Sequence, residues 1–429
     1  MTRFAPAAVL LTVVALSLAA APPAPLVRRD AMMPQLIDGR RALAAGDHAA
    51  AAAAIRRALE IVPDDPGLLF NLAQVEVRAG HLPEAMRLLD SLAGRDTGFD
   101  PSVDPSFAQL ASLPDYPALL ERFDRGASIL VRSTEAFRIE DPNLFPEGIA
   151  VDPRDGTLYV SSILKRKIVR VDRDGRVTDF VRERRDSLLG VLGLRVDVKR
   201  RLLWAVAAGG PEVEEAERDR SGLWAFDLAT GALVSRWRSP AGQPATFNDL
   251  TIDTHGRVYL TDSESGALYT TSGPSGALEV FLPPGQLRAP NGIDVAPDGK
   301  RLYVASSGRG ITAIDLATKR TTGLAVPRDV VALGIDGLYA NGKTLIAVQN
   351  MIGKPRIVRY TLRSPLEIGG LEVMEARHPL HDLPTTGAIW KSAFYYVANP
   401  HLDHLDANGA VVASDSLARL VILRLPLDG

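Results

Sequence analysis

One short phrase recurs six times in the last two-thirds of the chain. Each copy combines an apolar strand pattern, a polar turn and a second apolar strand pattern. The copies are EGIAVDPRDGTLYVSS from Glu147, LGLRVDVKRRLLWAVAA from Leu192, NDLTIDTHGRVYLTDS from Asn248, NGIDVAPDGKRLYVASS from Asn291, DGLYANGKTLIAVQ from Asp336 and TGAIWKSAFYYVANP from Thr386. Their starts lie about 45 to 55 residues apart, which is the period of a propeller blade. The sequence therefore predicts a six-bladed β-propeller over residues 132–429.

The first residues of the copies form a second pattern. A ring of six blades brings equivalent positions around one central channel. Four of these positions carry side-chain oxygen, namely Glu147, Asn248, Asn291 and Asp336. Hard cations such as calcium bind carboxylate and amide oxygens. We therefore expect Glu147, Asn291 and Asp336 to hold one divalent cation, with Asn248 as a further polar group nearby.

Turn chemistry offers an alternative explanation for the same positions. Asn-Gly, Asp-Gly and Glu-Gly pairs favour turns, and a strand entry requires a turn. Four oxygen-bearing side chains in six equivalent places exceed that requirement, which favours the cation site. The other two positions, Leu192 and Thr386, would leave one side of the ring open to water or substrate.

The N-terminal residues show the pattern of a secretory signal peptide. Arg3 precedes an apolar run from Ala7 to Leu18, and small residues follow at positions 19–21. The run is short for a membrane span of about 20 residues. We expect cleavage after residue 21, a Pro-rich linker over residues 22–33 and a periplasmic or secreted location. An uncleaved signal anchor is the alternative.

A helical pattern occupies residues 34–124, ahead of the propeller. Gly46 and Gly80 lie one tetratricopeptide period of about 34 residues apart, and so do Ala51 and Ala85. We interpret these small residues as points where paired helices approach closely. Because so few repeats bury little surface alone, we expect this mainly α-helical region to pack on the propeller or on a protein partner. A structural cap or spacer is favoured over a peptide-binding groove.

Composition limits the classes of partner. Lys and Arg number 49 against 51 Asp and Glu, giving a formal net charge of −2, which disfavours a nucleic-acid partner. The chain has no cysteine, so disulfides and thiolate metal sites are excluded. Beyond the N-terminal run, no stretch is long enough for a membrane span. Near the C-terminus, the strand pattern ARLVILRLPL is expected to share blade six with a strand from before Glu147.

The blade phrases resemble a known family. The resemblance rests on FPEGIAVDP around Glu147, FNDLTIDTHGRVYLTDS around Asn248, APNGIDVAPDGKRLYVASS around Asn291 and GIDGLYANGKTLIAV around Asp336. In number and order these segments look like the senescence marker protein/gluconolactonase/luciferin-regenerating enzyme family and, more distantly, like the paraoxonases and strictosidine synthases. The resemblance implies that Glu147, Asn291 and Asp336 bind a divalent cation. It also implies that Asn248 lines the substrate pocket.

Two positions depart from the family pattern. Thr246 stands where the sugar-lactone hydrolases often carry an arginine, and Ser306-Ser307 replaces an acidic residue at the end of blade four. These departures disfavour recognition of a polyol as in gluconolactonase. We expect Thr246, Thr386 and Asn248 on the substrate side of the site.

The resemblance implies metal-dependent hydrolysis of a lactone or ester. A cation would polarise the carbonyl and lower the pKa of a water, and Glu147 or Asp336 would act as general base. Calcium is the expected ion; magnesium, manganese and zinc stay open, and all-oxygen ligands disfavour zinc. The alternative is a non-catalytic scaffold propeller with a structural ion, whose helical repeats recruit a protein partner. An open polar pocket beside Glu147 and Asn248 would favour the enzyme, and a plugged channel the scaffold.

Histidines cluster late in the chain, in HPLHD from His378 and HLDHLD from His401. A histidine relay is one hypothesis, and a second metal site of His401, Asp403 and His404 is another. Histidines of this spacing on a loop have no fixed ligand geometry, so an ordinary surface loop is favoured. A Gly-x-Ser-x-Gly segment is missing, which disfavours a serine hydrolase.

Overall fold

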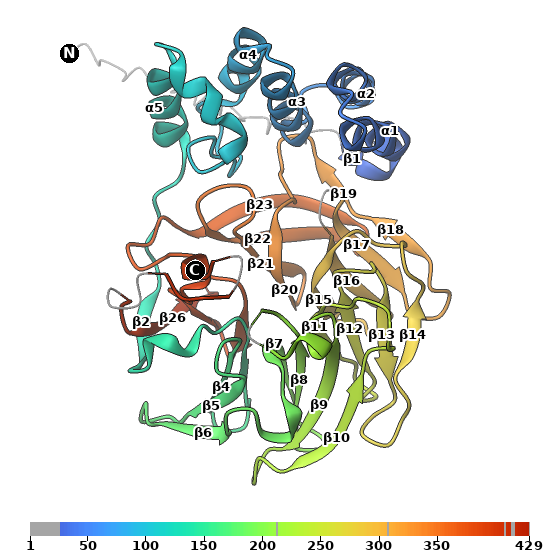
Figure 1. Cartoon of the computed structure of the whole chain (residues 1–429), viewed down its shortest axis with the longest axis vertical. Coiled ribbons are helices and arrows are strands. Elements are labelled where there is room, and N and C mark those ends of the chain that lie inside the picture. Colours follow the sequence, from blue (N-terminus) through green and yellow to red (C-terminus); the bar gives the residue numbers. More distant parts are fainter. Residues whose placement is uncertain (1–25, 212, 307–308, 407–408, 413–416, 429) are drawn as a thin grey trace, which may run out of the picture.

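The computed structural model describes residues 26–211, 213–306, 309–406, 409–412 and 417–428. In this part of the chain the strands form six β-sheets arranged as propeller blades, and a layer of helices lies across one side of them (Figure 1). The predicted signal peptide, residues 1–21, lies outside the described residues. Among the helices that are described, none is both long enough and apolar enough to cross a membrane.

The helical layer contains five α-helices and a longer 3-10 segment in the described residues. They are α1 (Met33–Ala44), α2 (His48–Ile61), α3 (Pro66–Arg78), α4 (Leu82–Leu92), η2 (Pro105–Ser112) and α5 (Tyr116–Gly126). The side chain of Asp47 accepts from Ala50 N at 2.9 Å at the start of α2. Asp65 accepts from Leu68 N at 2.8 Å at the start of α3. Such caps satisfy backbone donors that the first helical turn leaves free.

The small residues of the helical repeat have two different roles. Ala51 and Ala85 are fully buried, as close helix packing requires. Gly46 and Gly80 follow α1 and α3 with φ of 73° and 80°, and a Cβ on either would meet nothing within 4 Å. The expectation of close approach is therefore wrong for the two glycines. They are needed because only glycine adopts this left-handed backbone without strain.

Four blades follow the chain in order, each as a four-stranded antiparallel sheet whose first strand is innermost. Blade one comprises β3 (Ile149–Val151), β4 (Leu158–Ser162), β5 (Lys167–Val171) and β6 (Val177–Val181). Blade two comprises β7 (Gly190–Asp197), β8 (Leu202–Ala208), β9 (Ser221–Asp227) and β10 (Leu233–Arg238). Blade three comprises β11 (Phe247–Ile252), β12 (Val258–Asp262), β13 (Leu268–Thr271) and β14 (Glu279–Leu282). Blade four comprises β15 (Pro290–Val295), β16 (Arg301–Ser306), β17 (Gly310–Asp315) and β18 (Thr321–Gly323).

The last two blades include strands from distant parts of the chain. Blade five comprises β20 (Ile335–Asn341), β21 (Thr344–Gln349), β22 (Arg356–Ser364) and β23 (Glu367–Ala376), extended by β19 (Ala325–Pro327) and β1 (Leu26–Arg28). Blade six comprises β24 (Gly387–Trp390), β25 (Ala393–Val397), β26 (Leu420–Pro426) and β2 (Thr134–Ile139). The C-terminal strand β26 thus pairs with β2 from before the first blade, as its sequence pattern predicts. This pairing closes the ring.

The helical layer is attached to the propeller through backbone pairing and a buried arginine. Strand β1 pairs antiparallel with β19 on the outer edge of blade five. From β22, the guanidinium of Arg356 donates to Thr97 O at 2.9 Å and to Asp96 Oδ1 at 3.2 Å. Val331 and Leu333 of the propeller belong to the same apolar core as the helices. The helical region therefore packs on the propeller.

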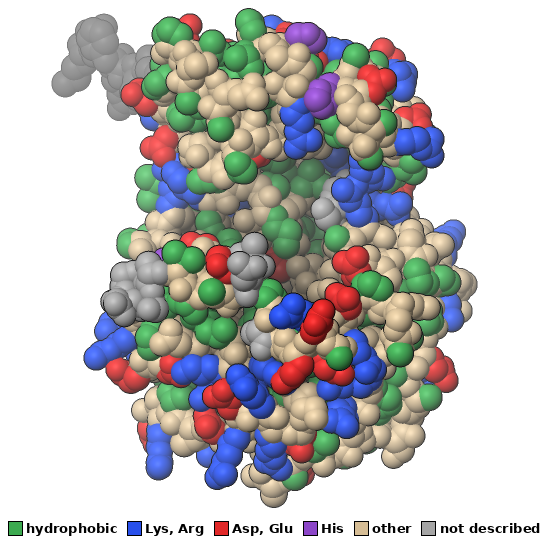
Figure 2. Space-filling model, in the orientation of Figure 1, with side chains coloured by type: hydrophobic (Ala, Val, Ile, Leu, Met, Phe, Trp, Pro, Cys, Tyr) green, Lys and Arg blue, Asp and Glu red, His purple; other side chains and the backbone are tan. Residues whose placement is uncertain are grey.

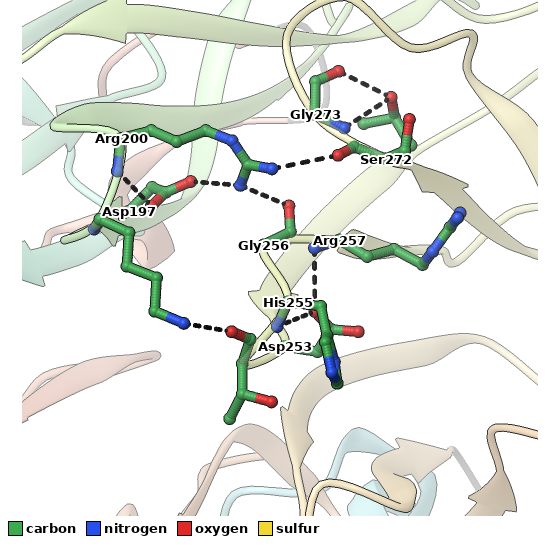
Figure 3. A network of polar contacts seen from close by, with 11 residues as sticks. Asp197, Arg200, Asp253, His255, Gly256, Arg257, Ser272 and Gly273 are labelled. Atoms are coloured by element: carbon green, nitrogen blue, oxygen red, sulfur yellow. Dashed lines mark hydrogen bonds and ion pairs between the residues drawn. The ribbon is translucent and has the colours of Figure 1, made fainter.

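Contacts between turns hold blades two and three together at one end of the channel (Figure 3). Arg200 binds Asp197 Oδ2 at 3.0 Å and donates to Gly256 O at 2.8 Å. In the facing turn, Asp253 Oδ1 accepts from His255 N at 2.8 Å. Strands β7 and β11 begin beside the predicted site residues and end at these turns. The network therefore lies at the end of the blades away from the predicted site.

Candidate metal centre and pocket

Irregularities in the inner strands mark the predicted site. In β11 the pairing with β12 shifts by one residue between Phe247 and Leu250. Strands β7, β15 and β20 contain the same one-residue shift at the equivalent place. Such β-bulges re-aim side chains and are frequent next to active sites. Asn248, Asn291 and Asp336 all lie within these bulges.

Glycine follows several of the site residues because neighbouring inner strands nearly touch there. A Cβ on Gly148 would lie 2.1 Å from Leu192 O, and a Cβ on Gly292 would lie 2.3 Å from Asp336 O. Both distances are too short for any side chain. These glycines therefore allow adjacent blades to meet at the channel. This close approach requires glycine more strictly than the formation of a turn does.

Asp336 is the centre of a buried cluster of amides and a carboxylate. Its Oδ1 accepts from Asn291 Nδ2 at 2.7 Å, and its Oδ2 accepts from Asn350 Nδ2 at 2.6 Å. Asn350 also donates to Pro384 O at 3.0 Å. Asn350 is not among the residues predicted from the first positions of the six copies. Its signal was its place directly after the second strand of blade five, the position that Ser263 occupies in blade three.

Several buried oxygen atoms at this end of the channel have no hydrogen-bond donor. They are Glu147 Oε2, Asn248 Oδ1, Asn291 Oδ1 and Asn350 Oδ1. An unsatisfied buried acceptor costs about 1–3 kcal/mol, so four of them together favour a ligand that supplies hydrogen-bond donors or positive charge. Carboxylate and amide oxygens are the donors that a hard divalent cation prefers. The residues present therefore fit such a cation.

The candidate ligand set depends on amides as much as on carboxylates. Within the described residues, no group of three or more His, Cys, Asp and Glu side chains is arranged to hold a metal ion. Glu147 and Asp336 supply two carboxylates. The amide oxygens of Asn291 and Asn350 complete an all-oxygen set with them.

The backbone of Glu147 is fixed from two sides. Its N–H donates to Ser161 Oγ at 3.1 Å. Its carbonyl oxygen accepts from Thr385 Oγ1 at 2.8 Å and from Thr386 Oγ1 at 2.5 Å. Thr386, expected on the substrate side, therefore uses its hydroxyl to join blade six to blade one and to position Glu147.

Burial changes the acidity of the carboxyl groups at the site. Burial, together with the charges of Asp336 and Asp249, raises the pKa of Glu147 well above its ordinary value. Burial raises the pKa of Asp336 to about 7, although its two amide bonds act in the opposite direction. Burial also raises the pKa of Asp249 to about 6, against the effect of Arg195. Each shift disfavours the charged form without a cation, and a bound cation would restore it.

Arg195 extends into the channel beyond the site, and it is not among the residues predicted from the first positions of the six copies. Its Nε donates to Leu250 O at 3.1 Å, and its Nη2 donates to Ile293 O at 3.3 Å. The guanidinium lies 5.5 Å from the ring centroid of Tyr339. These partners come two or three residues after the site residues of their strands, so Arg195 lies deeper in the channel. The site therefore lies nearer than Arg195 to one mouth of the channel.

A cavity of about 560 Å³ lies between that mouth and the helical layer. The propeller contributes Asn248, Ser263 and Asn291 to its lining, and the helices contribute residues such as Arg40 and Gln74. Figure 2 shows the hollow between the two parts of the molecule, with Lys and Arg side chains at one end of it. A cavity with both polar and apolar lining thus adjoins Asn248 and Asn291, whereas Glu147 is not part of its lining.

Thr246, one of the positions that depart from the family pattern, lies next to this wall, and Ser307 of the other departure lies outside the described residues. Thr246 N donates to Asp262 Oδ1 at 2.9 Å, and Thr246 O accepts from Ser263 N at 2.9 Å. Ser263 itself lines the cavity. The Oγ atom of Ser306 is buried without a partner.

The late histidines have separate environments. The expectation of a surface loop is wrong for His401, which is 4% exposed. Its Nδ1 lies 3.0 Å from Asp382 Oδ2, a partner that makes burial favourable. His404 is more exposed and lies 3.8 Å from Asp403. Among the residues that the structure describes, His401, Asp403 and His404 are not arranged to hold a metal ion, so a second metal site of these three residues is not formed.

Comparisons with known proteins agree with the two-part organisation. The family profile described as SMP-30/Gluconolactonase/LRE-like region matches residues 145–361, and a Tetratricopeptide repeat profile matches residues 42–105. No curated protein matches the chain.

Three solved structures have similar folds. A gluconolactonase from Xanthomonas campestris is 19% identical with a TM-score of 0.47, covering 67% of this chain and 89% of that chain. The calcium-binding protein regucalcin from Agrobacterium tumefaciens is 17% identical with a TM-score of 0.47. The match covers 70% of this chain and 95% of that chain. A luciferin-regenerating enzyme is 15% identical with a TM-score of 0.46. The match covers 70% of this chain and 96% of that chain.

Proposed function

The chain belongs to the SMP-30/gluconolactonase/LRE-like family, and on that premise we propose that it is a metal-dependent hydrolase of a lactone or related ester. Glu147, Asn291 and Asp336 would hold one divalent cation, with Asn350 as a further amide ligand. Calcium is the ion that we propose, because all the candidate donors are oxygens.

The single observation that carries this proposal is the set of buried acceptors without donors. Glu147 Oε2 and the Oδ1 atoms of Asn248, Asn291 and Asn350 belong to it. No donor from the described chain satisfies them, and a cation would satisfy several at once. Asn248 and Asn291 also line the cavity, so the proposed cation site adjoins the space for a substrate.

The chemistry needs a carbonyl to be activated and a proton to be moved. When bound, a divalent cation polarises an acyl carbonyl and acidifies water. Hydrolysis joins the oxygen of water to the acyl carbon and breaks the acyl C–O bond. Glu147 would accept the proton of the attacking water and return it to the leaving oxygen, and Asp336 is the second candidate base. Asn248 would contact the substrate from the pocket wall.

The proposal gives the helical layer and the N-terminal residues defined roles. The helices roof the substrate pocket, as the lining by Arg40 and Gln74 supports. Recruitment of a protein partner by the helical repeats is the alternative. We propose a periplasmic or secreted location, supported by the signal-peptide pattern of residues 1–21 and by the lack of cysteine.

A chelation experiment tests the proposed activity. The purified protein with added calcium chloride is assayed on a panel of lactones and aryl esters, with and without EDTA. We expect turnover that EDTA abolishes and that calcium restores. Asp336→Ala should be inactive, whereas Asp174→Ala, a matched change in an exposed turn of blade one, should retain activity. Turnover that survives EDTA, or that survives Asp336→Ala, would contradict the proposal. Tight cation binding without any turnover would favour the scaffold alternative.

A further inference from the structure

The cavity above the site has an unbalanced charge. Its lining includes Arg29, Arg40, Arg78 and Arg288, and no acidic residue. Only Arg29 has an ion-pair partner, since its guanidinium lies 3.0 Å from Asp65. Elsewhere in the described residues, no carboxylate lies within ion-pairing distance of Arg40, Arg78 or Arg288.

Like charges face each other across the two parts of the molecule. Arg40 belongs to α1, while Arg288 precedes β15 and Arg309 lies between β16 and β17. Burial and the neighbouring charges of Arg288 and Arg309 lower the pKa of Arg40. Arg309 donates to Gln286 O at 3.1 Å, but its Nε is buried without a partner. Arginines that repel one another around a cavity are stabilised when an anion binds between them.

The cationic cluster adjoins the proposed reaction centre. Arg288 is three residues before Asn291, and both line the same cavity. Apolar side chains form other parts of the lining, including Leu36 and Leu43 of α1 and Met351 of the propeller. A molecule in this cavity would therefore meet arginines, an apolar surface and the candidate cation site together.

We propose that the substrate is a lactone or ester with an anionic oxyacid group, a carboxylate or a phosphate, attached to an apolar body. This inference rests on the proposed function, and it adds the substrate class. Arg40 and Arg288 bind the anionic group, the former from the helical layer and the latter from blade four. The helical layer thus supplies part of the substrate specificity.

Anion binding can be tested without any turnover. Thermal melting and calorimetric titration are run with inorganic phosphate and, separately, with succinate, at low ionic strength. Either anion should raise the melting temperature of the wild-type protein, and the anion that binds more tightly identifies the oxyacid. Arg40→Gln and Arg288→Gln should each weaken binding about ten-fold. Arg41→Gln is the matched control, because Arg41 is the neighbouring residue on α1 and its side chain is 80% exposed.

The same variants separate folding from binding. Without an anion, Arg40→Gln should melt no lower than the wild type, because it removes repulsion between like charges. Binding that is equal in the wild type, Arg40→Gln and Arg288→Gln would overturn the inference, and so would a lack of binding to the wild type.

Catalysis gives a second, separable readout. With calcium present, kcat/KM is compared for an unsubstituted lactone and for a carboxylated or phosphorylated lactone of equal ring size. The wild type should prefer the anionic lactone about ten-fold or more, and Arg288→Gln should lose that preference through KM. A preference for neutral lactones would overturn the inference and leave the proposed hydrolase intact. Anion binding without turnover of any lactone would overturn the hydrolase and leave the anion site intact.

Discussion

The Nδ2 atom of Asn291 donates to Oδ1 of Asp336 at 2.7 Å and so links the inner strands of blades four and five. The bond directs the amide hydrogens of Asn291 at the carboxylate, and its Oδ1 is left without a donor. Asn350 is arranged in the same way on the other oxygen of Asp336. The proposed cation site thus consists of residues that already hold one another in place.

The hydroxyl of Thr386 should affect the site although it is bonded only to backbone. Thr386→Val removes the bond to Glu147 O, which is worth about 1 kcal/mol. We expect calcium affinity to fall roughly five-fold, because Glu147 loses part of its support. Calorimetric titration measures the change. Thr322→Val on β18 of blade four is the matched control, and an equal loss in both variants would contradict the positioning role.

The glycine between blades four and five should not tolerate a side chain. Gly292→Ala would place a Cβ 2.3 Å from Asp336 O and 2.5 Å from Leu338 N. We expect a loss of about 1–3 kcal/mol in the free energy of unfolding, together with weaker cation binding. Gly370→Ala in β23 provides the comparison, because its Cβ would meet nothing within 4 Å. Denaturant unfolding should separate the two variants clearly; similar midpoints would show that the strands can move apart.

Arg356 should be needed to hold the helical layer on the propeller. The guanidinium is buried and donates to Thr97 O at 2.9 Å and to Gln349 Oε1 at 2.8 Å. Arg356→Gln leaves these acceptors unsatisfied, with an expected cost of about 3 kcal/mol. Limited proteolysis should then cut residues 127–133 faster than in the wild type. Arg363→Gln, an exposed change on the same strand, should leave the cleavage rate unaltered.

The free energy of unfolding should decrease at acidic pH because of His381. Burial, with a smaller effect of His378, lowers the pKa of His381 to about 4. Its Nε2 lies 2.9 Å from the hydroxyl of Tyr396. The charge of Asp382 raises the pKa of His381 and so opposes the effect of burial. The unfolded chain would titrate near 6.5, so it binds more protons than the native protein between the two values. The contribution of neutral His381 to the free energy of unfolding is therefore complete above about pH 6.5, and it is lost as the pH falls toward about 4.

Thermal melts across that range test the contribution of His381. His381→Gln should show a shallower decrease in melting temperature between pH 6.5 and pH 4.5 than the wild type. His255→Gln, in an exposed turn of blade three, should retain the wild-type slope. An unchanged slope in His381→Gln would assign the acid sensitivity to other groups.

The repeat made part of the site predictable. Propeller symmetry places equivalent positions of each copy around one channel, so a single column of the repeat brought Asn291 and Asp336 to attention. Asn350 and Arg195 lie in other columns of the same repeat, where no shared chemistry marks them. The repeat also could not show that Asn291 bonds to Asp336, because that contact depends on how two bulges face each other.

Contacts outside the repeat were not predictable. The roof over the pocket brings Arg40 to Arg288, and neither the helical period nor the blade period relates these two residues. The error over His401 has a similar cause, because its partner Asp382 lies 19 residues earlier, in the other histidine-rich segment, and no local spacing relates the two. Non-periodic contacts between distant segments are set by packing in three dimensions, and local pattern carries little information about them.

The most direct test of the central claim is the amount of cation bound by the purified protein. Calcium-loaded wild type and Asp336→Ala are dialysed, and metal content is measured by mass spectrometry, with circular dichroism to verify that both are folded. The account predicts one calcium ion per wild-type chain and none in Asp336→Ala. Equal calcium content in the two folded proteins would contradict it.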